Sequence, residues 1–226
     1  MEFDSFVLAA STADLEEATA ATEHADAAEF RMDLASDPLE ALDDYDGELP
    51  LLVTNRADWE GGEADDDGRL TTLEATFDHD AVVAVDIELA ALSPHGPDVP
   101  SAVALRTEAR EWDLSVVASV HDFDRTPSVG ELRGLLSAAS EAGDVGKLAV
   151  TAANRSDTLA LLSATHEATA AGRRVATMAM GEPGRHTRAV APLYGSKIGY
   201  APPNAADATA PGQYDLETLS TLIEKL

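Results

Sequence analysis

The sequence of 226 residues contains no cysteine. This absence excludes disulfides, thiolate metal sites, iron–sulfur clusters and cysteine nucleophiles from the chemistry of the protein. No apolar run approaches the length of about 18 residues that a membrane helix needs, so we expect no transmembrane segment. The segment 1–17 has no basic residue and only a short apolar run. We therefore expect no signal peptide, and a cytoplasmic protein.

Basic residues are scarce, with 15 Lys and Arg against 42 Asp and Glu, which gives a formal net charge of -27. This charge disfavours nucleic acid and anionic membranes as the main partners, because both are polyanions. Hydrophobic residues still make up 45% of the chain, enough for a packed core rather than a disordered acidic tail.

Lysine is the scarcest charged residue, and only Lys147, Lys197 and Lys225 are present. Acidic excess with few lysines is typical of a halophilic protein, because in molar salt the screening length is only about 3 Å. An ordinary acidic cytosolic protein is the alternative. In either case, a lysine retained in such a chain is a candidate for a chemical role.

Short apolar segments alternate with longer helical patterns along the chain. The expected strands are 6–11, 28–33, 50–55, 81–89, 114–120, 146–152, 174–180 and 196–201. The expected helices are 12–24, 37–45, 69–78, 101–111, 128–141, 156–171, 187–193 and 215–225. Strands that are apolar throughout indicate parallel strands covered on both faces.

Eight such units of about 28 residues each predict a compact (β/α)8 barrel of the TIM type, formed by one domain over 1–226. A doubly wound sheet is the alternative, but no glycine-rich phosphate turn follows the first strand. The segment 202–213, rich in proline and alanine, has the length of a loop that often closes over a site.

Charged side chains lie near the carboxyl ends of the expected strands, where the catalytic groups of such barrels are found. Glu29, Arg31 and Asp33 alternate along the second strand and should share its interior face, as should Asp86 and Glu88 on the fourth. One interpretation is a set of internal ion pairs without a ligand. The other is an anion-binding pocket in which arginine holds a carboxylate.

Lys147 and His121 are the candidates for covalent and proton-transfer chemistry. Lys147 begins the sixth strand and is followed by apolar residues, a setting that favours the neutral amine needed to form an imine with a ketone. A surface lysine at the start of a strand is the alternative. His121 follows the fifth strand, and histidine is the usual acid or base near neutral pH. The other histidines show no metal-ligand spacing, so we expect no metal.

Short motifs in a fixed order over most of the chain are similar to those of type I 3-dehydroquinate dehydratases, in a haloarchaeal-like form. The motifs are EFRMD at 29–33, TNR at 54–56, EGG at 60–62, DIE at 86–88, SVHDF at 119–123, KLA at 147–149, MAMG at 178–181 and APGQ at 210–213. Each motif alone is weak, whereas their order and spacing are specific.

The resemblance implies removal of water from 3-dehydroquinate to give 3-dehydroshikimate, a step of the shikimate pathway and of aromatic amino acid biosynthesis. It implies that Lys147 forms an imine with the C3 ketone, that His121 is the acid and base, and that Glu60 orients His121. No cofactor or metal would be needed, and a homodimer would be expected. The implied substrate-binding residues are Glu29, Arg31, Arg56, Arg188, Thr209 and Gln213.

Two other functions remain open on the sequence. Another Schiff-base barrel, such as an aldolase or transaldolase, would also need a lysine at a strand end. A barrel that binds a small carboxylate without catalysis would keep Arg188 but would not need Lys147 or His121.

Overall fold

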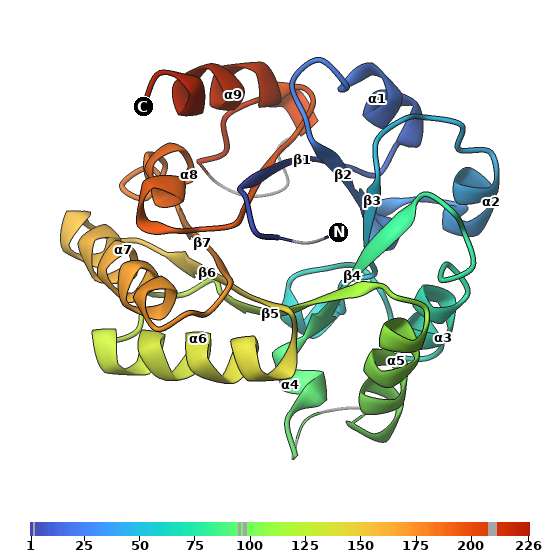
Figure 1. Cartoon of the computed structure of the whole chain (residues 1–226), viewed down its shortest axis with the longest axis horizontal. Coiled ribbons are helices and arrows are strands. Elements are labelled where there is room, and N and C mark those ends of the chain that lie inside the picture. The colour runs from blue at the N-terminus through green and yellow to red at the C-terminus, as the bar shows by residue number, and fades with distance from the viewer. Residues whose placement is uncertain (2, 95, 97–98, 208–211) are drawn as a thin grey trace.

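The computed structural model describes residues 1, 3–94, 96, 99–207 and 212–226. Eight parallel strands form one sheet in the order β7-β6-β5-β4-β3-β2-β1-β8. Their bounds are β1 (Val7–Thr12), β2 (Ala27–Arg31), β3 (Leu51–Thr54), β4 (Val82–Glu88), β5 (Ser115–Asp122), β6 (Val145–Thr151), β7 (Val175–Met180) and β8 (Ile198–Ala201). Figure 1 shows these strands as an inner ring with the helices outside it.

The ring is nearly closed between β7 and β8. These two strands meet through a bridge between Val175 and Ser196, and the Lys197 amide donates to the Val175 carbonyl at 2.7 Å. The predicted (β/α)8 architecture is therefore confirmed, and each expected strand is present within a few residues of its expected bounds.

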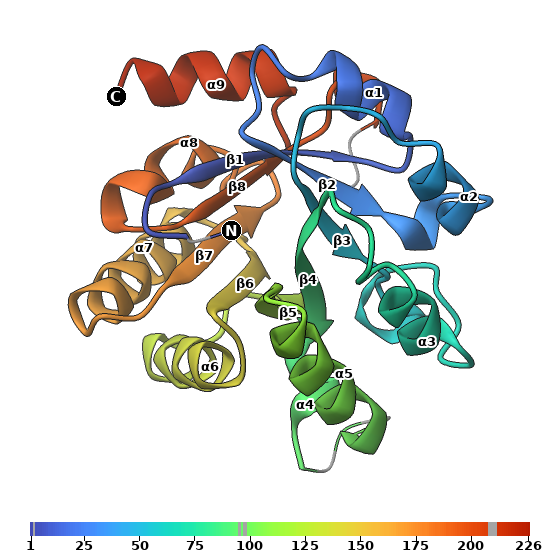
Figure 2. The ribbon, with the colours of Figure 1, turned by 45° about the vertical axis from the view of Figure 1, so that its right-hand side comes forward.

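The helices cover the outer face of the strands. They are α1 (Leu15–Ala20), α2 (Pro38–Asp43), α3 (Arg69–Glu74), α4 (Leu89–Leu92), α5 (Val99–Glu111), α6 (Val129–Ala142), α7 (Arg155–Ala170), α8 (Thr187–Val190) and α9 (Leu216–Glu224). The described residues also form the 3-10 turns η1 (Met32–Leu34), η2 (Asp58–Glu60), η3 (Ala191–Tyr194) and η4 (Ala205–Asp207). Figure 2 shows α6 and α7 side by side outside β6 and β7.

Capping side chains set the ends of several helices. Ser128 and Glu131 form a reciprocal capping box at the start of α6, close to the predicted start at residue 128. The first helix is shorter than the predicted range 12–24. It begins after Asp14, whose side chain accepts a hydrogen bond from the Glu16 amide, because β1 extends to Thr12.

The barrel interior is apolar at its amino end and polar at its carboxyl end. Small residues such as Ala9, Ala27 and Ala84 fill the amino end, and Phe3 of the N-terminal segment packs against them. The Ser115 hydroxyl donates to the Met1 carbonyl at 2.6 Å, which holds this segment across the end of the ring (Figure 1). The opposite end is left for the charged side chains.

In the part of the chain that the structure describes, no helix combines the length and the apolar character that spanning a bilayer would require.

Surface carboxylates lead to a prediction about salt. Among the described residues few of them are paired, and the exposed ion pairs include Arg133 with Glu167 and Arg174 with Asp4. We expect the melting temperature to fall as KCl is diluted below about 1 M, because the screening length rises from about 3 Å toward 10 Å at 0.1 M. Circular dichroism melts across a KCl series measure this effect. A melting temperature independent of salt contradicts this prediction. A neutral osmolyte of matched osmolality is the control, because it changes the water activity without screening the charges.

Candidate active site

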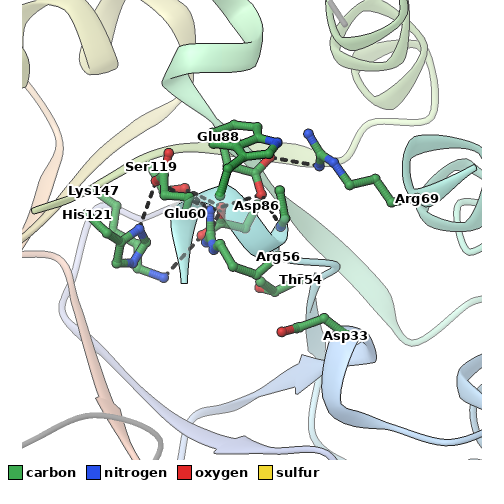
Figure 3. Close-up of polar contacts among 12 residues, drawn as sticks. Asp33, Thr54, Arg56, Glu60, Arg69, Asp86, Glu88, Ser119, His121 and Lys147 are labelled. Carbon is green, nitrogen blue, oxygen red and sulfur yellow. Dashed lines mark hydrogen bonds and ion pairs between the residues drawn. The ribbon is translucent and has the colours of Figure 1, made fainter. Parts of the chain in front are cut away.

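A polar pocket opens at the carboxyl end of the barrel, and Figure 3 shows much of the hydrogen-bonded network inside it. Side chains from all eight units line or support it. The charged and histidine side chains that line it are Glu29, Arg31, Arg56, Glu60, His121, Lys147 and Arg188. Gln213 lies at the pocket as well. The structure thus brings together eight of the nine residues that the sequence analysis assigned to the site. The ninth, Thr209, lies outside the described residues.

Lys147 lies at the centre of the pocket and is only 4% exposed. Its Nζ is 3.1 Å from Asp86 Oδ2 and 3.4 Å from Glu29 Oε1, and it lies 4.2 Å from the centroid of the Tyr200 ring. The apolar residues that follow Lys147 in the sequence predict apolar surroundings for this amine. That expectation is wrong, because β2 and β4 supply carboxylates that the sequence of β6 alone does not reveal.

The two carboxylates beside Lys147 are held by hydroxyl groups. Ser11 Oγ donates to Glu29 at 2.6 Å, and Thr54 Oγ1 donates to its other oxygen at 3.1 Å. Burial alone would raise the pKa of Glu29, but the charges of Lys147 and Arg31 and the Ser11 hydrogen bond outweigh it, so the pKa is lowered. Glu29 therefore stays ionised at neutral pH.

Asp86 is held in the same way from the other side of Lys147. Ser119 Oγ donates to Asp86 Oδ1 at 2.6 Å, and Arg56 Nη2 approaches the same oxygen at 2.7 Å. Burial opposes ionisation, yet the charges of Arg56 and Lys147 and the Ser119 hydrogen bond hold the pKa of Asp86 well below its usual range. Lys147 therefore lies between two permanent negative charges.

Arg56 connects this pair to the loop after β3. Burial disfavours its charge, but Asp86, Glu88 and Glu60 outweigh that effect and raise its pKa. Glu88 accepts hydrogen bonds from the Ala57 amide at 3.0 Å and from the Arg69 side chain at 2.9 Å. Glu88 thus fixes the chain that leads from β3 into η2, where Glu60 is found.

Glu60 and His121 form a hydrogen-bonded pair, with Glu60 Oε1 2.9 Å from His121 Nδ1. Burial raises the pKa of Glu60 to about 8, assisted by the nearby charges of Glu88 and Asp86 and opposed by Arg56. Burial, together with the charges of Arg56 and Lys147, lowers the pKa of His121 well below its ordinary value. These opposite shifts favour a pair that shares one proton and carries no net charge.

A glycine allows this pair to form. Gly61 follows Glu60 with φ at +80°, a left-handed conformation that favours glycine, and a Cβ there would collide with the Phe123 ring. Phe123 in turn stacks on His121, with the ring centroids 5.9 Å apart and 12° between the planes. The Glu-Gly-Gly motif at 60–62 thus has a local steric reason.

Arg188 differs from the other arginines of the pocket because it has no carboxylate partner within the described part of the chain. Its side chain comes from α8, is 5% exposed, and its Nε has no hydrogen-bond partner among those residues. Burial lowers the pKa of Arg188 to about 10, so it still carries a charge at neutral pH. A buried guanidinium with no carboxylate partner among the described residues is suited to bind an anionic group.

The chain that carries this site matches a known protein family. The family model for type I 3-dehydroquinase matches residues 5–226. The chain belongs to the type I 3-dehydroquinase family.

Two haloarchaeal relatives of this family are similar over the whole chain. A 3-dehydroquinate dehydratase of Halobacterium salinarum is 56% identical and is covered over 100% of both chains. One of Haloarcula marismortui is also 56% identical over 100% of this chain and 98% of its own. This agrees with the haloarchaeal-like form that the sequence analysis inferred.

A solved structure of the family has the same fold. The type I 3-dehydroquinate dehydratase of Clostridium difficile, solved with covalently modified comenic acid, has a TM-score of 0.84 and 26% identity, and the match covers 98% of this chain and 92% of that one.

The positions or roles of some site residues differ from those that the sequence predicted. Asp33 was expected on the interior face of the second strand, but β2 ends at Arg31, and Asp33 lies in η1, where it forms a two-pronged pair with Arg31 at 2.6 and 2.8 Å. Asp86 was noted as an interior charge but not assigned to the site. Tyr200 was not predicted as a site residue. Its position two residues after Ile198 on β8 indicated that it faces the interior, since alternate strand residues share one face.

No cluster of metal-binding side chains is found among the described residues.

Proposed function

We propose that this protein is a 3-dehydroquinate dehydratase that removes water from 3-dehydroquinate through an imine on Lys147. The observation that carries the proposal is a lysine amine buried between Glu29 and Asp86, beside the Glu60–His121 pair, in a chain of the type I family. The product would be 3-dehydroshikimate, an intermediate of the shikimate pathway.

The imine is what makes the elimination feasible. The Lys147 nitrogen adds to the C3 carbonyl, and loss of water from that adduct gives a protonated imine. Loss of the C2 proton then places its electron pair in an enamine, and these electrons expel the C1 hydroxyl, which leaves as water after receiving a proton. Addition of water to the resulting imine releases the enone and restores Lys147.

Glu29 and Asp86 would stabilise the positive charge on the lysine nitrogen throughout this sequence. They already contact the ammonium at 3.4 and 3.1 Å, and hydroxyl donors and Arg56 fix their positions. A protonated imine carries the same charge at the same place. Electrostatic groups that need no rearrangement during reaction are an effective source of transition-state stabilisation.

His121 and Glu60 would supply and remove the protons. A pair that shares one proton would give it to the hydroxyl lost during imine formation and would then take the C2 proton. It would pass that proton to the departing C1 hydroxyl and accept another when water attacks the product imine. Arg188 would bind the substrate carboxylate, and Arg31 would help to frame the pocket. Thr209 and Gln213 would contribute from the loop after β8.

The pKa of Glu60 gives a prediction for the pH profile. A carboxyl whose pKa is raised to about 8 keeps its proton below that pH and loses it above, so kcat is expected to fall about tenfold per pH unit above pH ~8. Glu60→Gln has no such titration. It should lack this alkaline limb and turn over roughly 10²-fold more slowly.

A control from the same loop makes this test specific. Glu63 is exposed, so Glu63→Gln should retain the wild-type rate and pH profile. An alkaline limb that persists unchanged in Glu60→Gln would show that another group supplies the proton.

The direct test of the function is the appearance of the conjugated enone from 3-dehydroquinate, followed by ultraviolet absorbance in high salt. Turnover is expected, and its absence at every salt concentration contradicts the proposal. Cleavage of a sugar phosphate, or inhibition by inorganic phosphate that competes with substrate, would instead favour an aldolase-like enzyme. Tight carboxylate binding without turnover would favour a binding protein.

A further inference from the structure

The hydroxyl group of Tyr200 is buried in the site and has no hydrogen-bond partner among the described residues. Tyr200 is 4% exposed, and the oxygen itself is sealed from solvent. A buried hydroxyl without a partner costs free energy, because it has given up its bonds to water without replacement. A phenylalanine would fill nearly the same space without this cost. The hydroxyl therefore serves the free protein poorly.

The ring of Tyr200 lies against the reacting nitrogen. β8 pairs with β1 so that Tyr200 lies opposite Ala9, and its side chain joins the interior cluster of the barrel. Lys147 Nζ lies over the ring, 4.2 Å from its centroid. A molecule joined to Lys147 must therefore lie in the immediate surroundings of Tyr200.

Arg188 shares this part of the pocket. Tyr200 and Arg188 both line the main pocket, and both line a side cavity of about 10 Å³, which is space for about one water molecule. Arg188 Nε is the second buried polar atom at this place that has no partner within the described ranges. Two donors without a partner among the described residues, on side chains that line the same pocket and the same side cavity, indicate a ligand that brings acceptor oxygens there.

We propose that Tyr200 is a substrate-positioning residue whose hydroxyl donates a hydrogen bond to an oxygen of the molecule held on Lys147, on the side of the pocket where Arg188 lies. The proposal rests on the proposed function, which supplies an oxygen-rich anionic substrate. Burial, together with the charges of Glu29 and Asp86, raises the pKa of Tyr200, so the phenol remains a donor over the working pH range.

Tyr200→Phe tests this role because it keeps the ring over Lys147 and removes only the hydroxyl. We expect the KM for 3-dehydroquinate to rise about tenfold with kcat changed less than about threefold, since a bond made equally to bound substrate and transition state alters binding alone. The melting temperature of the ligand-free variant should equal or exceed that of wild type. The rise in melting temperature on addition of saturating 3-dehydroshikimate should become smaller.

The matched control is Tyr194→Phe, which removes the hydroxyl of a tyrosine that is 41% exposed on η3. It should leave KM, kcat and both melting temperatures unchanged. A wild-type KM in Tyr200→Phe contradicts the proposal, and so does a lower melting temperature of its ligand-free form, which would assign the hydroxyl to the fold through a buried water. Failure of wild-type protein itself to turn over 3-dehydroquinate contradicts the proposed function instead.

Discussion

Lys147→Arg is expected to fold normally and to lose turnover by at least ~10⁴-fold, the scale on which removal of a covalent nucleophile acts. The guanidinium keeps a positive charge between Glu29 and Asp86, so the internal ion pairs survive the substitution. It cannot release a proton to become a nucleophile, because an arginine between two carboxylates stays protonated over the whole working pH range. This variant therefore separates the chemistry of Lys147 from its charge.

Lys147→Met provides the complementary measurement. Removing the cation leaves Glu29 and Asp86 buried with one fewer partner, and breaking a buried pair in this way destabilises a protein by about 3–5 kcal/mol. Denaturant unfolding in high salt should show this loss for Lys147→Met and little change for Lys147→Arg. Equal stability of both variants would mean that the carboxylates depend on Arg56 and the hydroxyl donors instead.

Borohydride trapping identifies the nitrogen that bonds to the substrate. Reduction in the presence of 3-dehydroquinate should convert the imine into a stable secondary amine on Lys147, located by mass spectrometry of peptides. Lys225→Arg, which changes an exposed lysine, should label like wild type, and Lys147→Arg should not label. Inactivation without a label, or a label on Lys197, would exclude the proposed imine.

The architecture and several site positions could be predicted because they depend on local pattern. Eight apolar runs separated by helical segments indicate a parallel barrel, and such a barrel places its chemistry where the strands end. The scarcity of lysine indicates Lys147 as a candidate for a chemical role from the sequence alone. The second-strand pattern correctly placed Glu29 and Arg31 at the pocket.

What could not be predicted depends on contacts between distant segments. Glu60 and His121 are 61 residues apart, and only the resemblance to a family related them before the structure did. The carboxylates beside Lys147 come from strands that the sequence of β6 does not describe. Asp33 was misplaced because the chain turns into η1 right after Arg31, and alternation along a strand cannot reveal where the strand ends.

His121→Ala should lower kcat by about 10² to 10⁴-fold while leaving Lys147 able to react, which distinguishes a proton carrier from a nucleophile. The ring of His121 is bound to Glu60 and stacked on Phe123, so its loss removes the proton relay without removing a buried charge partner of Lys147. Long incubation with 3-dehydroquinate and borohydride should therefore still label Lys147, although the adduct forms slowly.

The exposed His166 on α7 supplies the control, and His166→Ala should behave as wild type in both rate and labelling. Two results would contradict the assignment of His121. One is near wild-type turnover in His121→Ala, which would place the essential proton on another group. The other is complete loss of labelling after long incubation, which would make His121 necessary for the lysine to react at all. A slow variant that still labels leaves one consistent account, in which Lys147 forms the bond and the His121–Glu60 pair moves the protons.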